Sequence, residues 1–270
     1  MRIPRLYTPQ RFIPGKDLSV TGQTAHHVAN VLRLRSGAAL AVFDGKGSEH
    51  RAVVRTIKRS EIILEIAEAI ATLQEPSLDI TLLQGIARND RMDFILQKAV
   101  ELGVTTIQPL WMQRSQARLK GNRLDKRRNH WQGVIISACE QCGRATLPQL
   151  GIAMNYSDWM VQQNSTGLRF LLQPESDTTL DELQPPEDKI QVLAGPEGGL
   201  NADEQALAKS AGFIGVRLGA RILRTETASL AALAGMQTLW GDFTRGVTAC
   251  ARPPQKGMFP EGPANRADRE

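Results

Sequence analysis

Residues 190 to 204 read Ile190-Gln-Val-Leu-Ala-Gly-Pro-Glu-Gly-Gly-Leu-Asn-Ala-Asp-Glu204, and this stretch decides the class of fold. Its first five residues are apolar enough for a buried strand. Its last four are typical of a helix start, because Asn201 can accept a backbone N–H while Glu204 reaches back to the helix cap. The glycine-rich loop between them therefore joins a buried strand to a helix, which is a unit of an α/β fold.

The same alternation runs through the chain from Leu78 onward. It predicts a mostly parallel sheet with helices on both faces, within one α/β domain over residues 78–245. Gly103 is expected to end the first helix, and Thr225 is expected to cap the last. The predicted strands cover residues 79–87, 105–111, 168–172, 190–194 and 213–218, and the predicted helices cover 91–102, 122–141 and 225–243.

The N-terminal part has a different pattern. Short apolar runs at residues 40–43, 51–57 and 61–66 predict strands, and Asp44-Gly45 is a strong hairpin signal between the first two. We therefore expect a small β-barrel over residues 1–73, followed by a linker at 74–77. Residues 249–270 contain prolines and scattered charges with few apolar anchors, so we expect a disordered tail.

Bulk composition excludes several classes of protein. The chain has 270 residues, of which 41% are hydrophobic and 23% charged, an ordinary mixture for a globular protein. The longest apolar runs are much shorter than a membrane span, and the first residues lack the apolar stretch of a signal peptide. We therefore expect a soluble, cytoplasmic protein with no membrane partner.

The cysteines do not indicate a disulfide framework or a metal site. There are three, Cys139, Cys142 and Cys250, and an odd number fits a reducing compartment. Cys139-Glu-Gln-Cys142 has the spacing of metal ligands, but no second pair of cysteines or histidines completes a site. We favour two helix cysteines and no metal.

Charge is unevenly distributed along the chain. Residues 1–60 contain 11 Lys and Arg against three acidic residues, a net charge of +8, and residues 111–150 contain eight against two, a net charge of +6. Residues 151–208 contain two against ten, a net charge of −8. Such polarity is typical of nucleic-acid binders, although runs of Lys and Arg are also found on ordinary solvated surfaces.

A second loop shares the setting of the first. Leu218-Gly-Ala-Arg-Ile-Leu-Arg-Thr-Glu-Thr-Ala228 follows a predicted strand and precedes a predicted helix. In open parallel sheets, ligands bind beyond the carboxyl ends of the strands, and glycines allow a ligand to approach the backbone closely. Either loop alone is equally consistent with a tight connection that ends in a helix cap.

Other catalytic motifs are absent from the sequence. There is no GxGxxG dinucleotide fingerprint, no GxxxxGK[ST] phosphate loop and no GxSxG nucleophile elbow. The four histidines, at positions 26, 27, 50 and 130, form no triad pattern. Hydride transfer, P-loop NTPase activity and serine hydrolase chemistry are therefore disfavoured.

Several motifs, taken in order, resemble one known family. The two loops are similar to the cofactor-binding pair of the SPOUT-class methyltransferases that act on N3 of a uridine in bacterial 16S ribosomal RNA. The similarity covers about residues 1–243, with small departures from the family's usual residues at Thr8, Val100 and Leu200. The other matching motifs are Met1-Arg-Ile-Pro-Arg5, His26-His-Val28, Val31-Leu-Arg33, Phe43-Asp-Gly45, Lys98, Glu101-Leu-Gly-Val104, Arg114-Ser115 and Glu140-Gln-Cys-Gly-Arg144.

The resemblance implies a PUA-like barrel followed by an α/β domain with a C-terminal trefoil knot, a topology that the residue pattern alone does not indicate. It also implies a homodimer that binds S-adenosylmethionine in the knot. The residues expected to bind this cofactor are Leu172, Gly195, Pro196, Glu197, Gly198, Gly199, Leu218, Gly219, Ile222, Leu223, Arg224, Thr225, Thr227 and Ala228.

The chemistry of the implied reaction selects further candidates. Uridine N3 carries a proton and is a poor nucleophile until that proton leaves, so the site needs a base or groups that stabilise the resulting anion. Glu226, Glu140 and Glu101 are candidate bases. Arg224, Arg144 and Arg114 are candidates for stabilising the anion or holding phosphate. Each is also consistent with a structural role as a helix-terminus charge or an ion pair.

Ribosomal RNA or the small ribosomal subunit is the implied partner. The cations expected to contact RNA are Arg2, Arg5, Arg33, Arg35, Lys126, Arg127 and Arg128. Two alternatives stay open: a SPOUT enzyme that methylates a ribose 2′-hydroxyl or another base, and an RNA-binding protein without catalytic activity.

Overall fold

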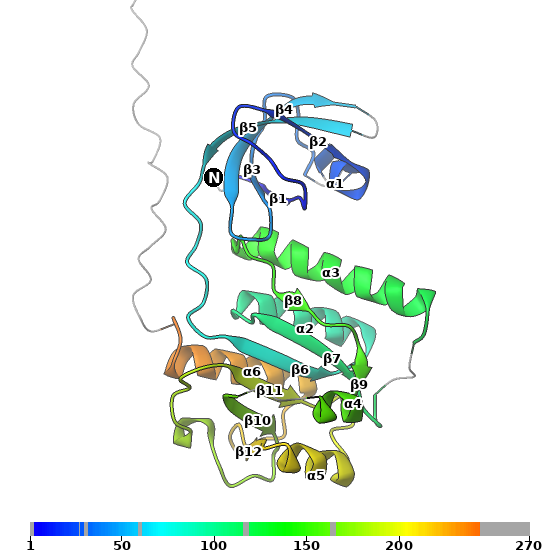
Figure 1. Cartoon of the computed structure of the whole chain (residues 1–270), viewed down its shortest axis with the longest axis vertical. Coiled ribbons are helices and arrows are strands. Elements are labelled where there is room, and N and C mark those ends of the chain that lie inside the picture. The colour runs from blue at the N-terminus through cyan, green and yellow to red at the C-terminus, as the bar shows by residue number, and fades with distance from the viewer. Residues whose placement is uncertain are drawn as a thin grey trace, which may run out of the picture.

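The computed structural model describes residues 3–26, 28–29, 32–58, 61–115, 119–162 and 166–243. They form an N-terminal β part and a larger α/β part, with the long helix α3 facing the β part (Figure 1). The predicted tail at 249–270 lies outside the described residues.

The β part is a five-stranded sheet in the order β1-β3-β4-β5-β2. β1 pairs parallel with β3, and the other neighbours are antiparallel. The three predicted strands are confirmed, and β1, β2 and the short helix α1 are additional. The bounds are β1 Arg5–Tyr7, β2 Asp17–Thr21, α1 Gly22–His26, β3 Ala39–Phe43, β4 Glu49–Ile57 and β5 Glu61–Ala69.

Alternating residues of these strands bury one face, as the pattern of β5 illustrates. Ile62, Leu64 and Ile66 are buried and pack with Leu40 and Val54. The predicted hairpin joins β3 to β4, and the Asp44 carboxylate accepts the backbone N–H groups of Lys46 at 2.7 Å and Ser48 at 3.1 Å. The side chain thus provides partners for turn amides that the ladder leaves unpaired.

The α/β part is built on a parallel sheet in the order β12-β10-β11-β6-β7-β8, with β9 also paired to β7. The five predicted strands and the three helices predicted with full ranges are all present, and so is α5, whose start was predicted at Asn201, whereas β8, β9, α4 and the 3₁₀ helix η2 were not predicted. The bounds are β6 Ile80–Gly85, α2 Asn89–Glu101, β7 Thr106–Trp111, α3 Asn122–Cys142, β8 Gln149–Leu150, β9 Met154–Asn155, α4 Tyr156–Val161, β10 Leu168–Leu172, η2 Leu180–Glu182, β11 Ile190–Ala194, α5 Ala202–Ser210, β12 Ile214–Val216 and α6 Thr225–Leu239.

Helices cover both faces of this sheet. Leu82 and Val192 point into a core shared with buried residues of α2, α3 and α6. Leu83 and Leu193, each the next residue along its strand, point into a second core with α4 and α5. Because successive strand residues face opposite ways, the continuous apolar runs of β6 and β11 supply both cores.

Two predicted helix ends are wrong in detail. α6 ends at Leu239 rather than near Phe243, and Arg224 rather than Thr225 is its N-cap residue. The Thr225 hydroxyl instead donates a hydrogen bond to the carbonyl of Gly195, across to the other predicted loop. The predicted end of α2 is confirmed, because Gly103 follows it with a positive φ of 83°.

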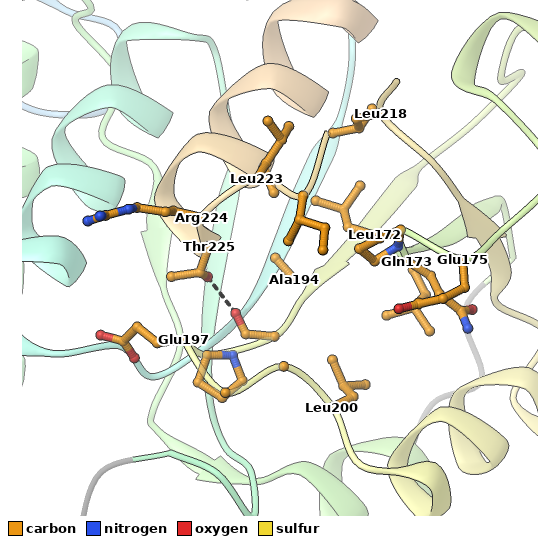
Figure 2. A pocket seen from close by; sticks show the side chains of 18 of the residues that line it. Leu172, Gln173, Glu175, Ala194, Glu197, Leu200, Leu218, Leu223, Arg224 and Thr225 are labelled. Atoms are coloured by element: carbon orange, nitrogen blue, oxygen red, sulfur yellow. Dashed lines mark hydrogen bonds between the residues drawn. The ribbon is translucent and has the colours of Figure 1, made fainter. Parts of the chain in front are cut away.

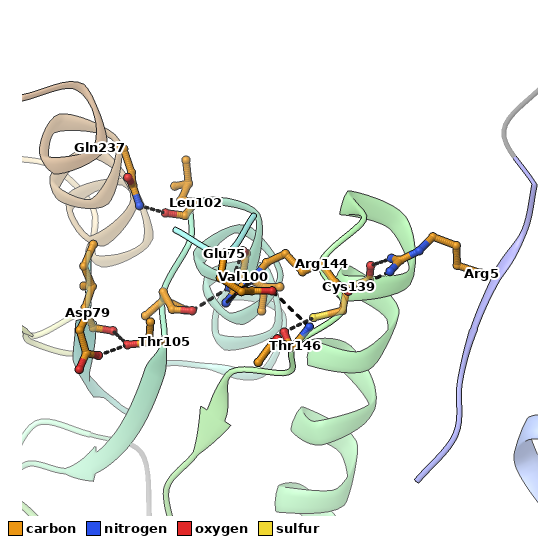
Figure 3. A network of polar contacts seen from close by, with 12 residues as sticks. Arg5, Glu75, Asp79, Val100, Leu102, Thr105, Cys139, Arg144, Thr146 and Gln237 are labelled. Carbon is orange, nitrogen blue, oxygen red and sulfur yellow. Dashed lines mark hydrogen bonds and ion pairs between the residues drawn. The ribbon is translucent and has the colours of Figure 1, made fainter. Parts of the chain in front are cut away.

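A polar network joins the two parts (Figure 3). Arg5 is buried, lies 2.9 Å from Glu49, and donates to the carbonyls of Cys139 and Arg144 on the α/β side. The Arg144 side chain contacts Glu75 at 2.9 Å and donates to the carbonyls of Val100 at 3.2 Å and Val104 at 2.8 Å. The predicted linker at 74–77 is therefore anchored through Glu75.

Two further predictions concern the cysteines, which are expected to lie on a helix, and the absence of a membrane-spanning segment. Cys139 and Cys142 both lie on α3 and are free, as predicted, and burial raises the pKa of the Cys139 thiol to about 12. In the described part of the chain, no group of three or more potential metal ligands is present. None of the helices described is long and apolar enough to cross a membrane.

Candidate functional site

The carboxyl ends of three neighbouring strands, β10, β11 and β12, meet at one edge of the parallel sheet. The segments that follow them surround a cavity of about 580 Å³. This volume is in the range of sites for small molecules and cofactors. The cavity therefore lies where the alternating strands and helices predicted a ligand site.

Both predicted loops line this cavity. Of the residues expected to bind the cofactor, only Thr227 is not part of the lining. The lining residues are Arg91, Arg114, Leu171, Leu172, Gln173, Pro174, Glu175, Ala194, Gly195, Pro196, Glu197, Gly198, Gly199, Leu200, Asn201, Ala202, Gln205, Val216, Leu218, Gly219, Arg221, Ile222, Leu223, Arg224, Thr225 and Ala228.

Two glycines of the first loop, Gly198 and Gly199, are favoured there for different structural reasons. Gly199 adopts a φ of 68°, which side chains rarely tolerate. At Gly198 an added Cβ would lie 2.9 Å from the Arg114 Cβ, and the Arg114 guanidinium donates to the Gly198 carbonyl at 2.7 Å. Arg114 therefore packs along the loop, and its carbonyl bond leaves the rest of its exposed guanidinium available.

The loop that begins at Gly195 is tied to the sheet and to α6 by a buried amide. Gln84, which is 0% exposed, donates to the Thr225 hydroxyl at 3.1 Å and accepts from the Ser229 hydroxyl at 2.7 Å. Thr225 in turn donates to the Gly195 carbonyl (Figure 2). Because buried polar groups are costly when unpaired, this network fixes the two loops relative to each other.

The end of β10 and the residues after it form a third wall of the cavity, and only Leu172 of this wall was predicted. Gln173 and Glu175 follow β10 and lie on the opposite side of the cavity from Glu197 and Arg224 (Figure 2). The signal was present in the sequence, since Gln-Pro-Glu directly follows a buried strand beside the one that leads to the glycine-rich loop. These residues lack the glycines that drew attention to the other two loops.

Charged residues gather between the cavity and the start of α2. Arg91 lies 3.6 Å from Glu197 and 3.9 Å from Glu226, while Glu197 also accepts the backbone N–H of Arg88 at 2.9 Å. The Glu226 side chain is 15% exposed, and its Oε2 atom is buried without a hydrogen-bond partner among the described residues. Arg224 is exposed, and its guanidinium bonds to no other described residue.

Three other candidates for the chemistry lie elsewhere. Glu140 accepts the backbone N–H of Tyr7 at 3.0 Å, and Arg144 is enclosed by Glu75 and two carbonyls. Glu101 forms an ion pair with Lys98 at 2.7 Å on α2. None of the three lines the cavity. These contacts fit the structural role that the sequence analysis set beside a catalytic one for each residue, and a part in the chemistry stays a prediction.

The residues expected to contact RNA are also divided. Arg5 is buried and paired, so it is not available to a phosphate. Arg33, Arg35, Lys126 and Arg128 are exposed. Arg127 is partly buried and donates to the side-chain oxygen of Asn89, and Arg2 lies outside the described residues.

Comparison with protein families gives two matches. Residues 74–237 match the model of an RNA methyltransferase domain, and residues 20–67 match that of an RNA methyltransferase PUA domain. The first covers more than half of the chain.

Individual relatives agree with the family models. The chain is 34% identical to a ribosomal RNA small subunit methyltransferase E from Buchnera aphidicola, over 90% of this chain and 96% of the relative. A Bacillus subtilis protein of the same name is 26% identical over 85% and 93% of the two chains.

Two solved structures resemble the whole fold. One is a ribosomal RNA small subunit methyltransferase E from Neisseria gonorrhoeae bound to S-adenosyl methionine, with 42% identity, a TM-score of 0.86, and coverage of 90% of this chain and 100% of that one. The other, from Legionella pneumophila in complex with the same cofactor, has 34% identity, a TM-score of 0.86 and the same coverage. The family resemblance noted in the sequence is confirmed, and this chain belongs to the RNA methyltransferase family that includes the ribosomal RNA small subunit methyltransferases E.

Proposed function

We propose that this protein transfers a methyl group from S-adenosylmethionine to N3 of a uridine in 16S ribosomal RNA. The observation that carries the proposal is the cavity at the ends of β10, β11 and β12, bounded by both loops that resemble the cofactor-binding pair. Relatives over nearly the whole chain are named as methyltransferases of the small ribosomal subunit, and two related structures contain the cofactor.

The residues present fit such a cofactor. The cavity offers apolar side chains, including Leu172, Leu200 and Leu223, for a flat ring, and the Gln173 and Glu175 side chains for hydroxyl or amino groups (Figure 2). Gly199 and Gly219 have positive φ angles and no atom within 4 Å of an added Cβ, so backbone there is open to a ligand. Bound S-adenosylmethionine supplies a methyl group already activated on a sulfonium.

The chain must therefore position the base and manage its charge. Arg224 is suited to the anion that spreads over O2 and O4 when N3 loses its proton, because it lines the cavity and its exposed guanidinium forms no ion pair with a carboxylate among the described residues. Arg114 and Arg91 line the same cavity and add positive charge.

Glu226 is the candidate for accepting the N3 proton. Its position in the first turn of α6 follows directly after Arg224 and Thr225, and one of its oxygens has no partner among the described residues. The contact with Arg91 at 3.9 Å is too long for a strong hydrogen bond. Glu226 itself is not part of the cavity lining, whereas its chain neighbours Arg224 and Thr225 are, so the proposal places its unpaired oxygen directly behind the wall of the cavity.

The finer architecture is also part of the proposal. We propose a PUA-like domain over 1–73, a SPOUT domain over 78–245 with a trefoil knot formed by its last segments, and a cytoplasmic homodimer. In support of the dimer, Ile222 beside the cavity is 85% exposed, and Leu239 at the end of α6 is 46% exposed. Because larger exposed apolar patches mark contacts between proteins, we propose that a second subunit covers these side chains.

The test is the identity of the methylated nucleoside. The purified protein is incubated with S-adenosylmethionine and small ribosomal subunits from a strain that lacks the gene, and the RNA is digested and analysed by mass spectrometry. We expect N3-methylated uridine at one position. Ribose-methylated nucleosides would instead establish the 2′-hydroxyl alternative, and no modification despite cofactor binding would contradict both.

A further inference from the structure

A groove separate from the cavity lies between the start of α2 and one face of α3. Its volume is about 440 Å³, and its lining contains three cations, a histidine and an amide but no acidic side chain among the residues described. The lining residues are Asn89, Leu119, Arg123, Lys126, Arg127 and His130. No part of the proposed reaction uses this groove.

The helical repeat explains why these side chains converge. Arg123, Lys126, Arg127 and His130 are spaced by three, four and seven residues from the first, so they share one face of α3. Arg128, although adjacent in sequence and exposed, is not part of the groove. The run of three basic residues predicted from the sequence is therefore divided between two faces of the helix.

Two contacts hold the groove in shape. The Arg127 guanidinium donates to the Asn89 side chain, and His130 Nε2 lies 2.7 Å from Asp93 Oδ2. Both partners belong to α2, so the two helices are fixed against each other at this point. Arg123 and Lys126 are exposed and form no ion pair with a described residue, which leaves their charges available to a ligand.

The groove and the cavity meet at the start of α2. Asn89 lines the groove, and Arg91, two residues later, lines the cavity. Successive Cα atoms are about 3.8 Å apart, so the two backbone positions are separated by at most about 8 Å. A nucleic-acid strand advances about 3.4 Å per nucleotide. Side chains and the bound groups themselves add to this separation, so we place a backbone held in the groove within a few nucleotides of the base at the cavity.

We propose that this groove binds a backbone phosphate of the RNA strand that carries the target base. The inference rests on the proposed function and deepens it, because it assigns to Arg123 and Lys126 the role of positioning the RNA strand relative to the cavity. A phosphate contact fixes register and orientation without reading sequence. Such an anchor is needed because an enzyme that modifies a base edge must draw that base out of its stack.

The first experiment measures binding to small ribosomal subunits as a function of salt. Arg123→Gln/Lys126→Gln should reduce the slope of log affinity against log salt by about two units, one for each cation removed. The matched control is Lys189→Gln/Lys209→Gln, which removes two exposed lysines outside the groove. Equal slopes for the two double variants would overturn the proposal, and circular dichroism establishes that both remain folded.

The second experiment locates the strand. A photoactivatable cross-linker on Lys126→Cys should mark nucleotides a few positions from the methylated uridine, whereas the same reagent on Lys209→Cys should not. Cross-links confined to distant nucleotides would overturn the proposed register. A third arm titrates inorganic phosphate alone: saturable binding in the groove at submillimolar concentration would identify a small-anion site and contradict an RNA site.

These outcomes are separable from a failure of the proposed function. If the salt slope and the cross-links depend on the groove but the wild-type protein transfers no methyl group, the groove stands as an RNA site and the proposed reaction is contradicted. If the protein methylates uridine but its slope of log affinity against log salt does not depend on Arg123 and Lys126, the proposed reaction stands and the proposed role of the groove is contradicted.

Discussion

The junction between the two parts of the molecule and the edge of the cavity are both built from arginines and glutamates, but they use them differently. At the junction, Arg5 and Glu49 have side chains only 6% and 9% exposed and meet at 2.9 Å. At the cavity, Arg91 contacts Glu197 and Glu226 at 3.6 and 3.9 Å, and Arg224 has no such partner among the described residues. Charge that is fully paired and buried supports the fold, whereas charge left incompletely paired is available to a ligand.

The largest expected effect comes from breaking the junction. Arg5→Ala leaves Glu49 buried without its partner and removes the bonds to the carbonyls of Cys139 and Arg144. We expect a loss of about 3–5 kcal/mol in the free energy of unfolding, measured by denaturant titration. A loss below 1 kcal/mol would show that the contact is not structural.

Removing Arg224 should slow the reaction and leave the stability of the protein almost unchanged. Arg224→Ala should change stability by less than about 0.5 kcal/mol, because the side chain is exposed. It should slow methyl transfer by about 10²–10³-fold, as for the loss of one group that stabilises a developing anion. Single-turnover rates at saturating cofactor and RNA measure this, and an unchanged rate with weaker RNA binding would make Arg224 a positioning residue only.

Glu226→Gln sharpens the comparison, because it keeps the shape of the side chain and removes its capacity to accept a proton. We expect methyl transfer to slow by about 10²-fold or more near neutral pH. The deficit should shrink as pH rises, since more uridine has then already lost its N3 proton. A rate equal to that of the wild type at every pH would return Glu226 to the role of a helix-start carboxylate.

The smallest expected effect is a loss of cofactor binding after a change in the glycine-rich loop. In Gly198→Val the added carbons meet the Arg114 side chain, so the loop and Arg114 must separate. We expect S-adenosylmethionine affinity to fall by at least tenfold in calorimetry, with a melting temperature that changes little. Gly133→Ala, at a helix position with no atom within 4 Å of the added Cβ, is the control.

The helices and strands were largely predictable because the apolar periodicity is local. The runs at 168–172 and 190–194 correspond residue for residue to β10 and β11, and Asn201 and Glu204 form the predicted reciprocal cap at 2.7 and 3.0 Å. The short elements β8, β9 and η2 were missed because they span only two or three residues, too few to show a period.

The two glycine-containing loops of the candidate site were predictable from the sequence. The part of the site that depends on which strands lie side by side in the sheet was not. Both loops were identified from their own residues, whereas Gln173 and Glu175 join them only because β10 lies beside β11 and β12. Arg91 was passed over as part of a helix, although its position on the first turn of α2 places it at the cavity.

The sequence by itself determined the class of fold, the order of the elements, the two loops and the family, because each depends on residues close together in the chain or on motifs in a fixed order. Only the tertiary structure decided which charges act within the fold. Arg5 and Arg144 matched the family as well as Arg224 did, yet they are enclosed by carbonyls and carboxylates from segments far away in the sequence. Whether a charge is neutralised depends on what packs around it, and that is fixed only when distant segments come together.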